Sequence, residues 1–297
     1  MTKPHVTGPI LVTGASGNLG GSVVHALASL GMPTRVAGTS PTPLQRRYPG
    51  TEVVRLDFHD PATFAPALEG AGGVFLVRPP AIATVGPTLN AMLYVAERSR
   101  VGHVVFSSVA GAEQNRAVPH HRVESHLRAS SLSWTILRPG FFAQNLADAY
   151  RDDIRDDDRL YLPAGLGEVA FIDTRDVGAA AAAVFAETAV HRGAGYLLTG
   201  PARMSFHEVA SVLGRELDRT ITYEPASAVA YLRHVHRQGR SWTQAAVQTM
   251  LHRGVRRGQA ELVDPTLAQL LGRAPRTLEQ YIREHRARWA RQDAPPT

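Results

Sequence analysis

Short apolar runs alternate with amphipathic segments through the first half of the chain. The run PILVTG at 9–14 has the pattern of a buried strand, and a helical pattern follows from about Asn18 to Leu30. Five more runs rich in β-branched and aromatic residues have strand length: 34–38, 51–56, 73–77, 103–108 and 133–138. Helical patterns separate them at 61–70, 86–100 and 119–130. Strands alternating with helices of this length predict βαβ units, and therefore an α/β fold with a parallel sheet covered on both faces.

The pattern changes after Gly140. We expect a helix at 141–150, a charged surface loop at 151–158, two short strands at 159–165 and 167–172, and a helix for which Asp176 is the N-cap. The run 193–200 predicts a strand that returns to the main sheet, and the chain from Pro201 onward is mostly helical. These features predict two domains, one of 1–150 with 171–200 and a smaller, mostly helical one of 201–297 with 151–170.

Two C-terminal segments, 227–235 and 241–255, carry large apolar residues at helical spacing. We expect most of them to be core and a few to cover a ligand crevice: Tyr231, Leu232, Trp242, Met250 and Leu251.

Composition excludes several classes of protein. The 297 residues are 44% hydrophobic and 20% charged, as is ordinary for a globular enzyme. No apolar run approaches the roughly 20 residues of a spanning helix, so we expect no membrane partner. The net charge is +6, and arginines are dense in two stretches, 253–258 and 283–291. Apolar residues interleave these arginines, which favours a solvated helix face over a surface that binds nucleic acid.

The residue types present also limit the chemistry. The absence of cysteine excludes disulfides, thiolate nucleophiles and cysteine-ligated metals, and it fits a reducing cytoplasm. We expect no metal site, because His234 and His236 point to different faces of a helix. The N-terminus runs almost directly into a strand, which leaves no room for a secretion signal. We expect a cytoplasmic monomer or homodimer.

The loop LVTGASGNLGG places Gly14, Gly17 and Gly20 between the first strand and the first helix. Glycine suits a turn of positive φ, the approach of a pyrophosphate to bare backbone, and close packing of helix on strand. The helix N-terminus would then hold the anion, with Ser16, Asn18 and Leu19 beside it. A tight turn alone would also use glycines, but their position in a βαβ unit favours a Rossmann-type, doubly wound dinucleotide-binding domain.

The end of the second strand distinguishes NADP from NAD. An acidic residue there would bind the two ribose hydroxyls of NAD, and the segment RVAGTSPTPLQRR has none. Thr39 and Ser40 offer hydroxyls instead, and three arginines are near enough in sequence to face a 2′-phosphate: Arg35, Arg46 and Arg47. NADP is therefore favoured, although these arginines would also suit the solvated face of a helix.

The ordered series of motifs resembles the NmrA-like group of atypical short-chain dehydrogenases/reductases. The motifs are TGASGNLG (13–20), RLDFHD with Asp57, GVFLVRPP (73–80), VVFSSVAGA (104–112), the segment 120–146, FIDTRDVGAA (171–180) and LLGRAPRTLEQYI (270–282). Together they span nearly the whole chain. The group includes quinone oxidoreductases, benzylic ether reductases, NmrA regulators and ketoreductases of specialised metabolism.

The resemblance implies roles for further residues. Asp57 would lie beside the adenine, although it could instead cap the next helix. The residues Val77, Arg78 and Pro79 would line the nicotinamide ribose. The residues Pro139, Gly140, Phe141 and Phe142 would flank the nicotinamide, or the Arg-Pro-Gly turn would merely end a strand.

The usual acid and base of the superfamily are missing. A tyrosine normally donates a proton while a lysine four residues later lowers its pKa, yet Lys3 is the only lysine and precedes all eight tyrosines. Alignment on Glu124 puts His120 or His121 at the lysine position, where a helix dipole would favour neutral imidazole. Ser107 and Ser108 end the fifth strand, as in a reductase. All four are catalytic candidates, although such serines often satisfy backbone groups and such histidines often face solvent.

Two functions fit these observations. The first is an NADPH-dependent reductase that transfers hydride to a ketone or quinone of an aromatic, polyketide-like molecule, as in antibiotic biosynthesis. Such acceptors spread the new charge over a ring or take a proton from their own hydroxyl, so the enzyme supplies position more than acid. The alternative is a redox sensor of the NmrA type that binds NADP(H) without turnover and signals to a protein partner.

Overall fold

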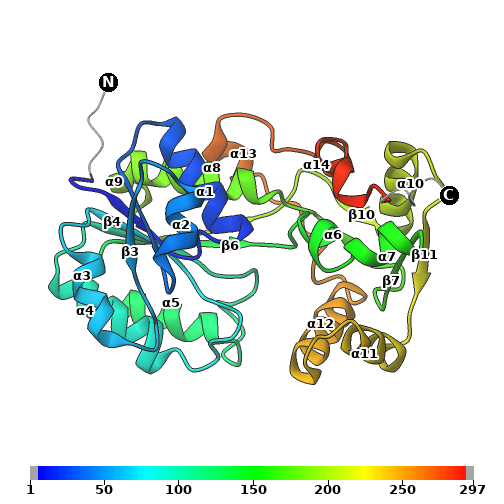
Figure 1. Cartoon of the computed structure of the whole chain (residues 1–297), viewed down its shortest axis with the longest axis horizontal. Helices are drawn as coiled ribbons and strands as arrows, with labels where there is room; N and C mark the ends of the chain where they lie inside the picture. The colour runs from blue at the N-terminus through cyan, green and yellow to red at the C-terminus, as the bar shows by residue number, and fades with distance from the viewer. Residues whose placement is uncertain (1–5, 292–297) are drawn as a thin grey trace. The chain divides into compact units, whose positions relative to one another are not determined.

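The structure is a computed structural model that describes residues 6–291. They form two compact units (Figure 1). Unit 1 comprises the chain up to Pro139 together with Thr174–Leu198 and Thr266–Ala274. Unit 2 comprises Gly140–Asp173, Thr199–Pro265 and the chain from Pro275. No helix within 6–291 has both the length and the apolar character required to span a bilayer.

Unit 1 is built on a seven-stranded sheet in which every pair of neighbours is parallel. The strands are β1 (Ile10–Val12), β2 (Thr34–Gly38), β3 (Glu52–Arg55), β4 (Gly73–Val77), β5 (His103–Ser107), β6 (Trp134–Pro139) and β9 (Ala194–Leu198). Their order is β3-β2-β1-β4-β5-β6-β9, with the reversal of a doubly wound fold between β1 and β4. The predicted α/β class is confirmed, and the run 193–200 does return to the main sheet beside β6.

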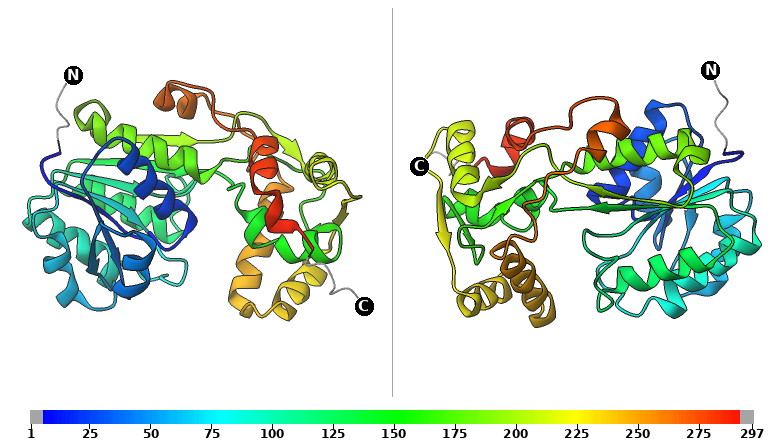
Figure 2. Two further views of the ribbon diagram at one scale, coloured as in Figure 1. Left: turned by 45° about the horizontal axis from the view of Figure 1, so that its top comes forward. Right: turned by 180° about the vertical axis from the view of Figure 1, so that it is seen from behind.

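Helices cover both faces of this sheet (Figure 2). The helices of unit 1 are α1 (Asn18–Ser29), α2 (Pro41–Arg47), α3 (Phe64–Leu68), α4 (Ala91–Arg98), α5 (Pro119–Ala129), α8 (Thr174–Ala186), α9 (Thr188–His191) and α13 (Thr266–Leu271), with shorter turns at Pro61–Thr63 and Gly86–Asn90. On one face α3, α4 and α5 bury Phe64, Met92 and Leu127 against strand residues such as Leu76 and Phe106. On the other face α1 and α8 cross closely, because Gly178 leaves room for the Ser22 backbone.

Unit 2 has two small sheets and a set of short helices. The strands β7 (Arg159–Leu162) and β11 (Thr222–Pro225) pair in parallel, and β8 (Glu168–Val169) pairs with β10 (Met204–Ser205) antiparallel. The helices are α6 (Asn145–Asp148), α7 (Arg151–Asp156), α10 (Phe206–Leu217), α11 (Ala228–Arg237), α12 (Trp242–Val255) and α14 (Leu278–His285), followed by a turn at Arg286–Trp289. Aromatic side chains fill the core of this unit, among them Phe171, Phe206, Tyr231 and Trp289.

The units divide the chain at other points than the expected domains do. Residues 140–150 lie in unit 2, because Ala143, Leu146 and Tyr150 join its core. The segment 266–274 lies in unit 1, since α13 packs on α8 and β9. Asp176 is not an N-cap: α8 begins at Thr174, and the Asp176 carboxylate in its first turn pairs with Arg273 at 2.6 Å.

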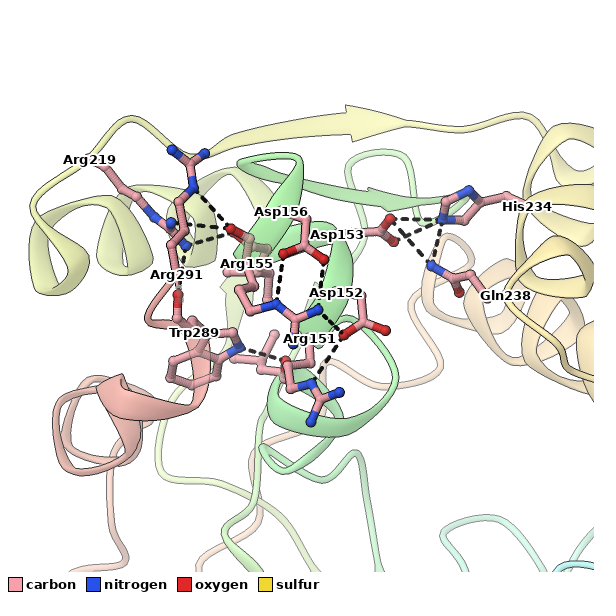
Figure 3. A network of polar contacts seen from close by, with 12 residues as sticks. Arg151, Asp152, Asp153, Arg155, Asp156, Arg219, His234, Gln238, Trp289 and Arg291 are labelled. Carbon is pink, nitrogen blue, oxygen red and sulfur yellow. Dashed lines mark hydrogen bonds and ion pairs between the residues drawn. The ribbon is translucent and has the colours of Figure 1, made fainter. Parts of the chain in front are cut away.

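The predicted surface loop at 151–158 is wrong, because Arg151–Asp156 forms α7. Figure 3 shows the reason: the charged residues find partners on both sides of this helix. Arg155 pairs with Asp152 and Asp156 along the outer side. Asp153 is 4% exposed and accepts a hydrogen bond from His234 Nε2 at 2.9 Å, and burial raises the pKa of Asp153. Ion pairs of Arg155 and the hydrogen bond to Asp153 therefore stabilise a helix in a segment whose composition suggests a loop.

The expectation that most apolar residues of 227–235 and 241–255 are core is also wrong. Tyr231 is buried and Leu232 half-buried, but Trp242 is 53%, Met250 63% and Leu251 57% exposed. The helix α12 buries its opposite side instead, through Ala245, Thr249, His252 and Val255.

Candidate functional site

The loop between β1 and α1 has the conformation that its glycines predict. Gly14 has φ +68°, which side chains rarely adopt. A Cβ on Gly20 would lie 2.3 Å from the Gly14 carbonyl oxygen, so the close contact of helix and loop requires glycine there. The fold of the loop therefore requires glycine at positions 14 and 20 even without a ligand.

Gly17 differs from the other two glycines. Its φ is −92°, and a Cβ there would meet only the Gly14 oxygen, at an ordinary 3.5 Å. Gly17 is the N-cap of α1, which has no side-chain cap and no acidic residue in its first turn. The positive end of the helix dipole therefore lies beside an open, exposed stretch of backbone that includes Ser16 and Asn18. A phosphate group fits this cradle, and a side chain at position 17 would fill it.

The segment after β2 holds the loop in place. The Tyr48 hydroxyl donates to the Ala15 carbonyl oxygen, and Arg47 Nη1 donates to the Ser16 carbonyl oxygen, each at 2.7 Å. Thr39 and Ser40, at the carboxyl end of β2, are exposed. Polar groups that could take a ribose phosphate therefore lie along the edge of the phosphate loop.

The three arginines expected near a 2′-phosphate are separated by the fold. Arg35 is excluded, because its guanidinium donates to the Ala67 and Glu69 carbonyls and pairs with Glu52 at 2.8 Å. Arg46 is exposed on α2. Arg47 is the member of this group that contacts the loop.

Residues after β3 and β4 surround the same strand ends. The half-buried Asp57 accepts a hydrogen bond from the His59 N–H at 2.9 Å, so it fixes the turn that follows β3. The Val77 N–H donates to Thr13 Oγ1 at 2.9 Å, which joins the end of β4 to the end of β1. Arg78 donates to the carbonyl oxygens of Pro79, Pro80 and Ile82, so its side chain stabilises the turn that follows β4.

The two serines at the end of β5 point in opposite directions. Ser107 pairs in register with Val77 and is 4% exposed, and its hydroxyl has no hydrogen-bond partner within residues 6–291. Ser108 faces α5, where its hydroxyl donates to Glu124 Oε1 at 2.5 Å. Ser107 thus keeps a hydroxyl available to a ligand, whereas the hydroxyl of Ser108 is used by the protein.

Glu124 is the centre of a buried ionic network. Its fully buried carboxylate receives Arg138 Nε and Nη2 at 3.0 and 2.8 Å, and Arg128 Nη2 at 2.7 Å. Burial raises the pKa of Glu124, but the hydrogen bonds from Arg138 and Ser108 outweigh that effect and hold the pKa below its ordinary value. This network joins α5 to the ends of β5 and β6.

His120 and His121 lie in the first turn of α5, as predicted, but they have different partners. Arg78 Nε donates to His120 Nε2 at 3.2 Å, and burial, followed by the charge of Arg78, lowers the pKa of His120 to about 4. His120 is therefore neutral near pH 7, with its proton on Nδ1. His121 Nδ1 donates to the Ala112 carbonyl oxygen at 2.8 Å, which leaves Nε2 as the available nitrogen.

The residues expected to flank a nicotinamide belong to both units. Pro139 ends β6, and its carbonyl oxygen accepts from the Ala110 N–H at 3.1 Å. Gly140, Phe141 and Phe142 lie in unit 2, where the Phe141 ring contacts Phe171 edge-on at 5.5 Å between centroids. Phe142 forms a parallel bridge with Ile172.

Two contributors were missed from the sequence. The sequence shows Arg138 only as part of a turn, although it neutralises Glu124, and it gives no indication of the role of Tyr48. Their partners are 14 and 33 residues away in sequence. The single available signal was the apolar strand context of Arg138, since an arginine buried in a strand requires an acidic partner.

Comparison with known proteins agrees with this geometry. A model of the NmrA-like family matches residues 7–282. The chain is 30% identical to (4-alkanoyl-5-oxo-2,5-dihydrofuran-3-yl)methyl phosphate reductase of Streptomyces griseus, over 93% of this chain and 97% of that one. It is 28% identical to NAD(P)H azoreductase of Xenophilus azovorans, over 94% and 98%. The crystal structure of an NADPH-dependent quinone oxidoreductase of Escherichia coli, complexed with NADPH, has a TM-score of 0.84 at 24% identity and covers 93% and 99%.

Proposed function

The chain belongs to the NmrA-like family, and from that premise we propose that it is an NADPH-dependent reductase of quinones and related conjugated aromatic acceptors. The predicted class, an NAD(P)H-dependent oxidoreductase, is confirmed by relatives named azoreductase, reductase and quinone oxidoreductase. Its cofactor is NADP(H), as in the solved quinone oxidoreductase complex. The single observation that carries the proposal is the open backbone cradle at Gly17, which the protein does not need for its own packing.

The residues of unit 1 would hold the nucleotide at known strand ends. The loop 14–20 would take the pyrophosphate at the N-terminus of α1, and Thr39, Ser40 and Arg47 would take the ribose phosphate. When bound, NADPH supplies a hydride to the acceptor. The free Ser107 hydroxyl is the group of this chain best placed to hydrogen-bond the ribose or the acceptor at the end of β5.

The proton remains the difficult part of the reaction. His120 is neutral and its Nε2 is used by Arg78, so it is no strong acid near pH 7. A quinone or a hydroxyaromatic ketone of the polyketide type delocalises the charge that it gains or uses its own hydroxyl. We propose that the acceptor belongs to this class, which includes intermediates of antibiotic biosynthesis, and that the enzyme contributes mainly orientation.

An acceptor panel tests this function. We expect NADPH oxidation, followed by absorbance, with 1,4-naphthoquinones and hydroxyanthraquinones. With aliphatic ketones kcat/KM should be at least about 100-fold lower, because the general acid that would stabilise their alkoxide contributes that much. Equal rates on both classes would contradict the proposal. Tight NADPH binding without oxidation of any acceptor would indicate the sensor function instead.

Arg47→Ala tests the ribose phosphate site. Loss of a charge-assisted hydrogen bond to phosphate should raise the Kd for NADPH about tenfold and leave the Kd for NADH within about twofold. Arg46→Ala, the exposed neighbour, is the matched control and should change neither Kd. Equal losses for both nucleotides in Arg47→Ala would show that Arg47 only supports the loop through the Ser16 carbonyl.

His121→Ala tests whether the enzyme supplies the proton. With a quinone acceptor, kcat should fall by less than about tenfold, whereas removal of a true general acid costs about 100-fold or more. The kcat of His121→Ala and of the wild type should be compared between pH 6 and 9. A loss above about 100-fold at pH 6 that shrinks as the pH rises would assign the acid to His121 and reject assistance by the acceptor.

A further inference from the structure

The exposed side of α12 carries one continuous stripe of mixed character. Trp242, Ala246, Met250 and Arg253 follow at i, i+4, i+8 and i+11, which places them along one face of the helix. All four are exposed. Val247 and Leu251, also exposed and four residues apart, form the next row of the same surface. The side of α12 that the core of unit 2 leaves uncovered is thus an apolar strip that ends at the Arg253 guanidinium.

The charge around this strip has one sign. Between residues 225 and 260 the chain has no Asp or Glu and six arginines: Arg233, Arg237, Arg240, Arg253, Arg256 and Arg257. All six are exposed, and within the described residues 6–291 none of them forms an ion pair. Several other arginines of unit 2 are paired, as Arg155, Arg219 and Arg291 are in Figure 3. The segment that holds α11 and α12 therefore carries positive charge with no carboxylate of its own between residues 225 and 260.

The two helices are held in a fixed arrangement. His236 of α11 stacks on the Trp242 ring at 3.8 Å between centroids. On the buried side, His252 Nδ1 donates to the Gln248 carbonyl oxygen at 2.7 Å, and Tyr150 is hydrogen-bonded to His252 Nε2. The apolar strip therefore lies on a helix that contacts α11 through Trp242 and the core of unit 2 through His252, which is the kind of support a ligand-binding surface needs.

We propose that the strip Trp242–Ala246–Met250, with Arg253 at its end, is a binding site of unit 2 for an amphiphilic anion. Its flat or extended apolar body would lie on Trp242 and Met250, and an acidic group such as a sulfonate, phosphate or carboxylate would bind Arg253. This site goes beyond the proposed reductase function and does not depend on it. Charge complementarity decides the occupant, since a neutral aromatic molecule would leave the guanidinium unused.

Isothermal titration without nucleotide, using anthraquinone-2-sulfonate and the neutral 2-(hydroxymethyl)anthraquinone as probes, tests the proposal. Arg253→Glu should raise the Kd of the sulfonate at least about tenfold and that of the neutral probe less than about twofold. Met250→Glu should raise both about tenfold, because it removes the apolar contact. Arg233→Glu, an equally exposed arginine of α11, is the matched control and should change neither Kd.

The remaining outcomes are distinguishable from one another. Equal effects of Arg253→Glu and Arg233→Glu on the sulfonate would overturn the proposal, since the attraction would then be nonspecific. Unchanged Kd values of both probes in Met250→Glu would also overturn it. The same holds if the variants abolish binding to phosphatidylglycerol vesicles but bind both probes normally, since the strip would then be a membrane-binding surface. The Kd for NADPH, measured on the same samples, should be the same in all variants. Failure of the wild type to oxidise NADPH with any acceptor would reject the reductase function without altering these Kd values.

Discussion

Gly17→Ala should raise the Kd for NADPH by roughly 100-fold, which corresponds to about 2.7 kcal/mol, while the melting temperature of the protein without nucleotide stays the same. The added methyl would meet only the Gly14 oxygen at 3.5 Å in the protein itself, so the fold has room for it. The phosphates of the nucleotide would not have room beside this methyl, because they must approach the backbone at the N-terminus of α1. Titration of NADPH fluorescence and a thermal melt measure the two quantities separately.

Two other glycines supply the controls for Gly17→Ala. Gly20→Ala would place a Cβ 2.3 Å from the Gly14 carbonyl oxygen, so we expect loss of folding stability as well as of binding. At Gly86 a Cβ would meet nothing within 4 Å, and Gly86→Ala should change neither quantity. A normal Kd in Gly17→Ala would mean that the cradle does not hold the phosphates, and the proposed cofactor site would have to be abandoned.

The parts of the fold that the sequence predicts well are those that depend on local pattern. The strands at 34–38, 73–77 and 103–108 are short apolar runs between turn residues, and the structure has β2, β4 and β5 there. The order of the strands and the helices on both faces follow from the chirality and connection rules of βαβ units. The glycine array could be interpreted because its spacing and its place after the first strand are themselves local.

The parts that could not be predicted depend on register and on distant partners. Arg35 was a candidate for the 2′-phosphate, but the pairing of β2 with β3 sets it opposite Glu52, and no pattern along β2 reveals that register. The segment 151–158 has the composition of a loop, and the His234 that buries Asp153 is 81 residues away. Trp242 and Met250 have the spacing of a core helix, but unit 2 covers only one side of α12.

The same limit applies to the candidate catalytic residues. Ser107 and Ser108 are indistinguishable in sequence, although the end of β5 turns Ser108 toward Glu124 and leaves the Ser107 hydroxyl without a hydrogen-bond partner among residues 6–291. Glu124 itself serves in the sequence only as the position on which the alignment is anchored. Its main partner is Arg138, which is brought to it by the pairing of β5 with β6. Where a function depends on a hydroxyl being free, tertiary pairing decides which of two neighbours provides it.

Glu124→Leu should lower the free energy of unfolding by up to about 3–5 kcal/mol, because the largely buried Arg138 guanidinium loses its buried counter-charge and keeps only the more exposed Glu113 among residues 6–291. The double variant Glu124→Leu with Arg138→Met should lose much less, since both charges are then removed and apolar groups take their place. Arg128→Leu removes a more exposed partner of the same carboxylate and should cost less than about 1 kcal/mol. Urea unfolding of the wild type and the three variants measures these differences.

The pH dependence provides an independent check on the charge of Glu124. Its pKa in the folded protein is lowered, because the hydrogen bonds from Arg138 and Ser108 outweigh the effect of burial, so the native state favours the carboxylate. The stabilisation is complete above the pKa of glutamate in the unfolded chain, about 4.3, and is lost as the pH falls through the lower folded value. The difference in unfolding free energy between the wild type and Glu124→Gln should therefore be constant from pH 8 to about 5 and shrink below about 4. A difference that stays constant in acid would show that packing, rather than the ion pair, joins α5 to the ends of β5 and β6.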